Sequence, residues 1–276
     1  MKKFSLLLIL LFCWNVYAAW GYDVKVGGIY YNLDSDNHTA SVTYASVSSY
    51  TGDVVVPEEI SVNGTKYAVT SLGNDCFDGC TGLTSITIPS SVTSLGDCCF
   101  MDCTGLTSVT IPSSVTSLGG SCFKECTGLT SITIPNSVQS LGDGCFANCS
   151  LTSITIPSSV TSLGDECFHG CIGLEEITML PTTVPYAGDY TFYETPLRTI
   201  YVANDEAKAL YQAASPWNKY DIVSLNIEAG VSQISGSDTA PQVTGYYDLS
   251  GRLTGKQRGV VIERYADGTS RKVMVK

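Results

Sequence analysis

Cysteine pairs four residues apart recur along the chain, and thiols at this spacing could form disulfides, bind a metal ion or fill a core. The 276-residue sequence contains 12 cysteines. Five pairs share the spacing: Cys76/Cys80, Cys99/Cys103, Cys122/Cys126, Cys145/Cys149 and Cys167/Cys171. Side chains four apart on a helical turn seldom bring their Cβ atoms to the distance of about 3.8 Å that a disulfide requires. Cys98 has no partner at this spacing, which predicts at least one free or intermolecular thiol.

An internal repeat must position these pairs. The segment at residues 83–89, Leu-Thr-Ser-Ile-Thr-Ile-Pro, recurs at residues 106–112, 129–135 and 151–157, at intervals of 23, 23 and 22 residues. Its alternation of apolar and polar residues predicts a strand with Ile86 and Ile88 pointing inward and Thr87 toward solvent. The proline that follows ends the strand.

The second half of each repeat predicts a short strand and a packed corner. Val92 and Leu95 begin the second strand, Gly96 turns the chain, and Phe100 packs the corner between its flanking cysteines. One unit is too small to bury its own apolar side. Successive units must therefore stack into a solenoid with one continuous core.

The repeat resembles the leucine-rich repeat of BspA-like bacterial surface proteins, whose usual corner is A-F-x-x-C. Here the unit is L-T-S-I-T-I-P-x-S-V-x-S-L-G-x-x-C-F-x-x-C, and the resemblance covers about residues 53–224. The chain departs from the family pattern by placing a cysteine where alanine is usual. The resemblance implies a β-rich leucine-rich-repeat solenoid of about 23 residues per coil, with short helical or 3-10 corners and capped ends.

The two ends of the chain differ from the repeats. Residues 1–18 have a positive start and a short apolar run, which predicts a secretory signal peptide cleaved after Ala18 and is too short for a membrane span. Residues 19–52 predict an N-terminal β cap. The Ala-rich residues 207–214 resemble the family's terminal helix, which covers the open end of the core.

The C-terminal tail is a separate segment. Residues 225–245 have the composition of a linker, and residues 246–276 predict three strands joined by glycine turns. That tail resembles the C-terminal sorting domain of type IX secretion cargo, which implies export through the outer membrane of a Gram-negative bacterium. A small β module without a sorting role is the alternative interpretation.

Three interpretations of the cysteines follow from the repeat. Bridges between neighbouring coils are geometrically feasible, because stacked strands lie about 4.8 Å apart. The favoured interpretation is a buried thiol stack, since the first cysteine of each pair replaces an inward alanine. A zinc site is disfavoured because the pairs repeat with the coil instead of placing four ligands at one point. We therefore predict no metal and no cofactor.

Nothing in the sequence predicts catalysis. The only histidines are His38 and His169, and no nucleophile elbow, HExxH, phosphate loop or dinucleotide fingerprint is present. Asp97, Asp143 and Asp165 recur with the repeat, so we interpret them as turn residues instead of an acid/base pair. No catalytic residue is assigned.

Two surfaces remain as candidate binding sites. Rows of hydroxyls across the main sheet could bind a ligand, although threonine also suits exposed strand positions. The candidate residues of this sheet surface are Thr84, Thr87, Thr107, Thr110, Thr130, Thr133, Thr152 and Thr155. An aromatic patch, which could equally be cap core, comprises Tyr186, Tyr190, Tyr193, Tyr201 and Trp217.

The distribution of charged residues limits the classes of partner that the protein could bind. The formal net charge is −11, and residues 19–245 hold 6 Lys/Arg against 23 Asp/Glu, whereas residues 246–276 hold 7 against 3. Such an acidic body disfavours binding to nucleic acid.

The sequence as a whole predicts a non-enzymatic exported solenoid, with no membrane span in the mature chain. The resemblance to BspA-like surface proteins implies an adhesion module that binds an extracellular-matrix or other cell-surface protein. The alternatives are a surface scaffold without a specific ligand and a glycan-binding solenoid.

Overall fold

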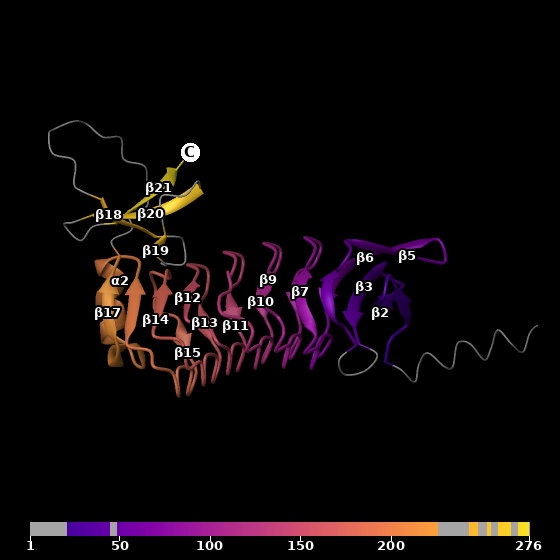
Figure 1. Ribbon diagram of the computed structural model, residues 1–276, viewed down its shortest axis with the longest axis horizontal. Helices are drawn as coiled ribbons and strands as arrows, with labels where there is room; N and C mark the ends of the chain where they lie inside the picture. The colour runs from indigo at the N-terminus through magenta and orange to yellow at the C-terminus, as the bar shows by residue number, and fades with distance from the viewer. Residues whose placement is uncertain are drawn as a thin grey trace, which may run out of the picture.

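The chain winds into coils that lie side by side in a row (Figure 1). The structure is a computed structural model, and it describes residues 21–44 and 49–225 together with four strands nearer the C-terminus. Strands pair in parallel from each coil to the next, which is the arrangement of a solenoid. The predicted fold class is confirmed.

One parallel ladder runs the length of the solenoid. Its strands are β6 (Thr65–Leu72), β8 (Ser94–Leu95), β10 (Ser117–Leu118), β11 (Ser140–Leu141), β13 (Ser162–Leu163) and β15 (Tyr186–Ala187). The leucines of neighbouring strands lie in register, as Leu95 does with Leu118, and these side chains are buried. This ladder forms one wall of the core.

The second ladder carries the threonine-rich strands and runs in two sections. One section is β4 (Gly52–Val55), β7 (Leu83–Thr87) and β9 (Ser108–Thr110); the other is β12 (Ser153–Ile156), β14 (Glu176–Met179), β16 (Thr199–Val202) and β17 (Asp221–Ser224). Residues 129–135 form no strand, so the continuous sheet expected from the sequence is interrupted there. The interruption falls where the repeat shortens from 23 to 22 residues. Ile132 and Ile134 nevertheless stay buried, because burial requires the side-chain direction and not a complete ladder.

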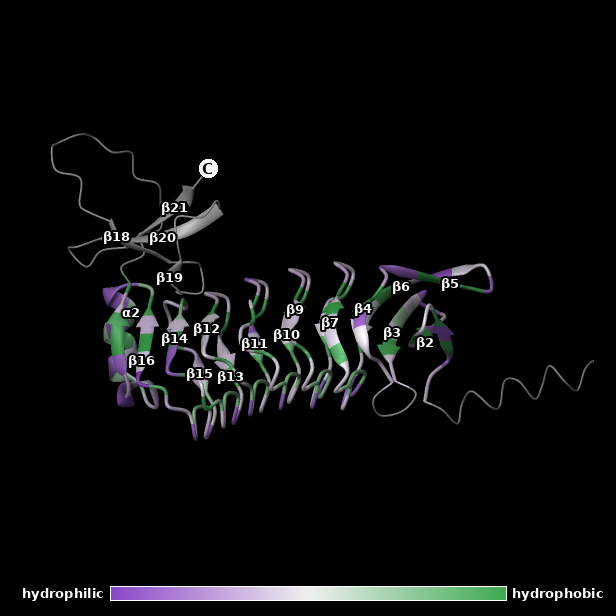
Figure 2. Ribbon diagram, in the orientation of Figure 1, coloured by the Kyte–Doolittle hydropathy of each residue, from purple (hydrophilic) through white to green (hydrophobic). Residues whose placement is uncertain are grey.

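The alternation predicted within each unit is confirmed. Leu83, Ile86 and Ile88 are at most 6% exposed, whereas Thr87 faces solvent. Each such side chain contributes roughly 1.5–3 kcal/mol when fully removed from water. In Figure 2 hydrophobic residues lie along the strands of the coils, and hydrophilic residues lie at the bends along the lower edge.

A column of stacked phenylalanine rings fills the corners. Its members are Phe77, Phe100, Phe123, Phe146, Phe168 and Phe192. Centroids of neighbouring rings lie 5.1 to 5.7 Å apart, and their planes differ by only 3° to 9°. Tyr50 continues the column toward the N-terminus, with its ring centroid 4.7 Å from that of Phe77. The column is a core element built from one residue per coil.

Glycine sets how closely the coils approach. A Cβ added at Gly96, Gly119 or Gly142 would lie 2.5 Å from an atom of the preceding coil. Aspartates beside these turns bond the next coil: Asp97 Oδ1 accepts the Gly120 N–H at 2.7 Å, and Asp143 Oδ1 accepts the Asp165 N–H at 2.9 Å. The predicted turn role of these aspartates is therefore confirmed.

The N-terminal cap is an antiparallel meander that joins the first ladder. It comprises β1 (Val24–Val26), β2 (Ile29–Asp34) and β3 (Thr39–Thr43), and β3 then pairs in parallel with β6. A further strand, β5 (Glu59–Val62), pairs with β6 through a tight turn at Asn63 and Gly64, whose φ angles are 51° and 84°. Both angles are positive, as the predicted hairpin turn requires.

The C-terminal cap consists of α2 (Asp205–Ala213) and the 3-10 turn η1 (Trp217–Lys219). The side chain of Asn204 begins α2 by accepting the Ala207 N–H at 2.8 Å. Tyr211 and Trp217 are buried, with their ring centroids 5.2 Å apart. A helix therefore lies where the Ala-rich stretch predicted one.

Four strands are described in the tail: β18 (Val243–Tyr247), β19 (Leu253–Thr254), β20 (Gly259–Tyr265) and β21 (Ser270–Val275). They form an antiparallel sheet in the order β19-β18-β20-β21, one strand more than the sequence predicted. The predicted signal peptide at residues 1–18 and nearly all of the predicted linker at residues 225–245 lie outside the described residues.

The close approach at Gly119 makes a specific prediction for stability. Gly119→Ala places a Cβ 2.5 Å from backbone atoms of Gly96, so the two coils must separate. We therefore expect the free energy of unfolding to fall by about 2 kcal/mol. Gly120→Ala is the matched control, because its Cβ would have no neighbour nearer than 3.5 Å. Urea unfolding followed by circular dichroism measures both variants. Equal unfolding midpoints for the two would contradict the proposed role of Gly119.

Candidate functional site

The cysteines form two buried columns, one from each member of the repeated pair. The first column is Cys76, Cys99, Cys122, Cys145 and Cys167, and the second is Cys80, Cys103, Cys126, Cys149 and Cys171. All ten side chains are at most 1% exposed. The eleven cysteines of the described residues are free thiols. The Sγ atoms of Cys76 and Cys99 lie 3.5 Å apart, well beyond the bond length of about 2.05 Å.

The second column bonds neighbouring coils together. Cys103 Sγ donates to the Phe77 carbonyl at 3.1 Å, and Cys149 Sγ donates to the Phe123 carbonyl at 2.9 Å. Cys126 and Cys171 make the same bond to the coil before them. The thiol hydrogen thus gives each of these four carbonyls a second hydrogen bond, in addition to the backbone N–H that it already accepts. The sequence identified these cysteines but not this partner, which lies 25 or 26 residues away.

Burial makes these thiols poorly reactive. It raises the pKa of Cys171 to about 11 and the pKa of Cys145 well above its ordinary value. Thiolate is the form that attacks electrophiles and binds metals, so the columns are poorly suited to either task. No cluster of three or more His, Cys, Asp or Glu residues that could hold a metal ion is found among the described residues.

Cys98 differs from the other described cysteines because its side chain is partly exposed. It adopts a left-handed backbone with φ of 52°. Partial burial is the main cause that raises the pKa of its thiol, and the nearby Asp75 and Asp78 carboxylates raise it further. Cys98 is therefore the accessible thiol among them, although a slow nucleophile at neutral pH.

The threonine rows lie on the outer side of the second ladder. Seven of the eight candidates are exposed, and Thr155 is partly buried. Thr87 is in register with Thr110 across β7 and β9. Near the N-terminal end, Thr84 and Ser85 donate to Asp53 Oδ1 at 2.7 and 2.6 Å, and these bonds lower the pKa of that carboxyl. Hydroxyls at this end are thus already paired within the protein.

The structure divides the aromatic patch into surface and core. Tyr186, Tyr190 and Tyr193 are 67%, 66% and 54% exposed. Tyr201 is partly buried on β16. Trp217 is 1% exposed and its indole N–H donates to the Pro185 carbonyl at 3.3 Å, so it belongs to the cap core. Three of the five residues therefore present a ring to solvent.

A groove of about 670 Å³ lies between the last coil and the C-terminal cap. Tyr190, Tyr193 and Glu194 line one side, and Lys219 and Tyr220 line the other. Four lining residues were not predicted from the sequence: Asp189, Glu194, Lys219 and Tyr220. The signal that could have found the groove is the departure of residues 186–194 from the repeat pattern.

His169 lies beside this groove and is partly buried, not fully solvated. Its ring centroid lies 5.6 Å from that of Tyr193. Its Nε2 atom is 3.6 Å from Glu194 Oε2, and its Nδ1 atom is 4.0 Å from Glu166 Oε2. The histidine therefore lies next to both the Tyr193 ring and the Glu194 carboxylate.

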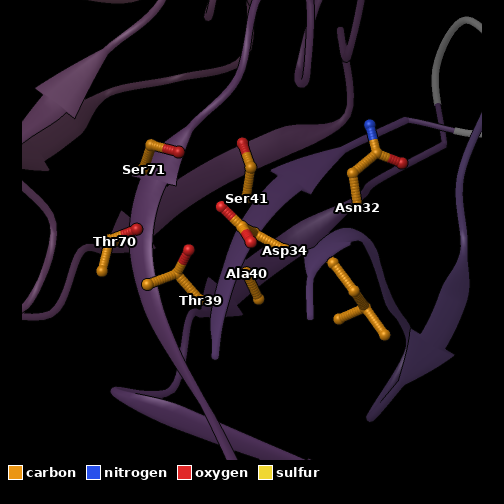
Figure 3. A pocket seen from close by; sticks show the side chains of 8 residues that line it. Asn32, Asp34, Thr39, Ala40, Ser41, Thr70 and Ser71 are labelled. Atoms are coloured by element: carbon orange, nitrogen blue, oxygen red, sulfur yellow. The ribbon is translucent and has the colours of Figure 1, made fainter. Parts of the chain in front are cut away.

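A smaller hollow of about 180 Å³ lies on the N-terminal cap over β2, β3 and β6. Figure 3 shows its polar side chains, among them Asp34, Ser41 and Thr70. The Asp34 carboxylate is occupied, because it accepts backbone N–H groups of Asp36 and Asn37 at 3.0 Å each. The Asp34 carboxylate therefore stabilises a turn of the chain at this hollow.

Solved structures of similar shape are leucine-rich-repeat proteins. A leucine-rich repeat protein from Bacteroides ovatus is 24% identical, with a TM-score of 0.52, over 74% of this chain and 68% of that one. The T. pallidum leucine-rich repeat protein is 27% identical, with a TM-score of 0.57, over 64% and 81%. A leucine-rich cell surface protein from Faecalibacterium prausnitzii is 24% identical, with a TM-score of 0.58, over 92% and 60%. No curated protein matches the chain.

Parallel coils, inward leucines and aromatic corners define the chain as a leucine-rich-repeat solenoid. The pattern of the BspA type leucine-rich repeat region matches residues 58–172, 93–214 and 139–237, with six copies. These matches together cover more than half of the chain, so the protein belongs to this family. Among the described residues, no helix is long and apolar enough to cross a membrane.

The buried columns predict how the thiols react. N-ethylmaleimide at neutral pH should label one described cysteine of the native protein, Cys98, and the other ten only after unfolding in urea without reductant. Labelling of Cys98 should accelerate as pH rises, because a raised pKa leaves little thiolate near neutrality. Intact mass spectrometry counts the labels, with Cys98→Ser as the control. Cysteines that become reactive only after reduction would reveal disulfides and overturn the assignment.

Proposed function

We propose that this protein is exported and acts as a non-enzymatic adhesion module at the outer surface of a Gram-negative cell. Its partner would be an extracellular-matrix protein or another cell-surface protein. The observation that carries the proposal is a rigid solenoid that presents ordered rows of exposed hydroxyls on one face. The similar F. prausnitzii structure is that of a leucine-rich cell surface protein, which supports the surface location.

The hydroxyl rows suit recognition of a polar protein surface. Thr87, Thr110 and Thr133 are exposed on successive coils, and a hydroxyl can both donate and accept hydrogen bonds. Threonine also loses little side-chain entropy when a partner binds, because its rotamers are already few. The scaffold beneath is held by the buried core, so binding requires little reorganisation.

The chemistry of the described residues supports a non-enzymatic role. Ten of the eleven described thiols are buried, and burial raises the pKa values of Cys103 and Cys126. The recurring Asp97 and Asp143 accept backbone hydrogen bonds at the turns. These buried thiols and turn aspartates therefore stabilise the stacking of the coils.

Two segments, one near each end of the chain, support the proposal that the protein is exported. Residues 1–18 have the pattern of a secretory signal peptide. Residues 246–276 resemble a type IX sorting domain, and the antiparallel order β19-β18-β20-β21 is compatible with such a β module. The excess of basic residues in the tail contrasts with the acidic body, which favours a separate task for each.

A surface scaffold without a specific ligand is the second candidate function. It is favoured by hydroxyls that are already paired inside the protein. Thr84 donates to Asp53 at 2.7 Å, and Thr107 donates to the Thr84 carbonyl at 3.3 Å. If the whole row served such internal bonds, the face would stabilise the sheet instead of binding a partner.

Binding to matrix proteins tests the adhesion proposal. Residues 19–276 should bind saturably to at least one protein on an array of extracellular-matrix proteins. Changing Thr87, Thr110, Thr133 and Thr155 together to Lys should abolish that binding, because four ammonium groups cover the hydroxyl face. The quadruple change to Ser keeps the hydroxyls and is the control. A silent array would favour the scaffold, and unchanged binding by the Lys variant would exclude this face.

Deletion of residues 246–276 tests the sorting role of the tail. The shortened chain should still cross the inner membrane but accumulate inside the outer membrane, because only the predicted outer-membrane signal is lost. Protease accessibility on intact cells and fractionation measure its location. A deletion limited to residues 230–240 is the control for shortening the chain. Surface display by the chain without residues 246–276 would contradict the sorting role.

A further inference from the structure

The last coil departs from the repeat at a position where the backbone disfavours a large side chain. One corner position of each coil has a left-handed backbone with φ of 52° to 59°. It is occupied by Asp75, Cys98, Ser121, Gly144, Glu166 and finally Tyr190. A bulky aromatic residue costs free energy in this region. The fold therefore does not require a tyrosine at this position. Tyr190 also remains 66% exposed.

The exposed rings of Tyr190 and Tyr193 contact each other. The ring centroids of Tyr190 and Tyr193 lie 5.7 Å apart, and their planes are nearly perpendicular at 87°. Tyr193 also contacts His169, with 5.6 Å between centroids. Perpendicular rings at this distance attract each other through their quadrupoles. The two rings thus present faces of different direction to solvent.

Charged and hydroxyl groups surround these rings. Asp189 and Glu194 supply carboxylates from the last coil, while Ser215, Lys219 and Tyr220 line the groove from the cap. The volume of about 670 Å³ is in the range, roughly 300–1,000 Å³, of sites that bind small molecules. The groove therefore combines aromatic faces, acceptors and a cationic donor at the size of a few sugar rings.

We propose that this groove binds a neutral oligosaccharide. The C–H face of a pyranose ring carries partial positive charge and packs on the electron-rich faces of Tyr190 and Tyr193. Sugar hydroxyls donate to the carboxylates of Asp189 and Glu194 and accept from the Lys219 ammonium group. The site requires no metal ion and no cofactor.

Charge and shape favour a neutral saccharide over other ligands. Residues 19–245 hold 23 Asp/Glu against 6 Lys/Arg, so a sialylated or sulfated sugar would meet repulsion. Aliphatic side chains in the lining are restricted to Ala187 and Pro216. A peptide anchor such as leucine would therefore meet few aliphatic side chains there.

The groove is distinct from the threonine face, so this inference goes beyond the adhesion proposal. The groove residues lie at residues 187–194 and 215–220. The Lys variants of Thr87, Thr110, Thr133 and Thr155 change none of them. Either proposal can therefore fail while the other stands.

The test uses the chain of residues 19–276 and two groove variants. The probes are maltotetraose, chitotetraose, xylotetraose and a printed array of neutral and acidic glycans. We expect saturable binding to at least one neutral glycan, measured by calorimetry. Tyr190→Ser with Tyr193→Ala should weaken it about tenfold or more, because both aromatic faces are lost. The chain itself holds Ser121 and Ala147 at the equivalent positions, so the variant should fold.

Two further variants separate recognition from folding. Tyr186→Ser removes another exposed tyrosine, which does not line the groove, and restores the serine found in register at Ser162. This control should bind as the parent does. Glu194→Asn, the residue at the equivalent Asn148, should also weaken binding. No binding to any glycan, binding confined to acidic glycans, or equal affinity of the Tyr190/Tyr193 variant and the parent would each overturn the proposal.

Discussion

Neighbouring coils bond backbone to backbone at a separation that leaves no space for a Cβ at the turn. Gly96, Gly119 and Gly142 meet that requirement in successive coils. The other regular features follow from the same spacing. Phenylalanine rings stack at 5.1 to 5.7 Å because each coil contributes one ring at one height. Thiols reach the carbonyl of the coil before them for the same reason.

Periodicity in the sequence was sufficient to predict the coil, its inward side chains and its corner. Ile86, Ile88 and Phe100 are buried as their spacing requires. The interruption at residues 129–135 was not predicted, because that segment has the same residue types as its neighbours. The bond from Cys103 to Phe77 joins residues 26 apart. Only the stacking geometry, which the sequence pattern does not contain, brings these two atoms together.

The candidate site was predicted in part, for a related reason. Tyr190 and Tyr193 were singled out as aromatic residues near the cap, but Trp217 belonged to the core. Its neighbours in sequence do not reveal which way the ring points. The groove also needs Lys219 and Tyr220, which lie a full coil farther along the chain. A surface made by two different elements requires the packing of α2 and η1 against the last coil, and no local pattern encodes that packing.

The direction of the inter-coil hydrogen bonds has a mechanical consequence. The bonds of Gly96, Phe100 and Gly119 each link one coil to its neighbour along the solenoid axis. A force that pulls the two ends apart therefore breaks these bonds one coil at a time. It does not shear all of them at once. Each released coil of about 23 residues would add roughly 80 Å of extended chain. The protein would lengthen in steps under tension while the coils that remain closed keep their shape.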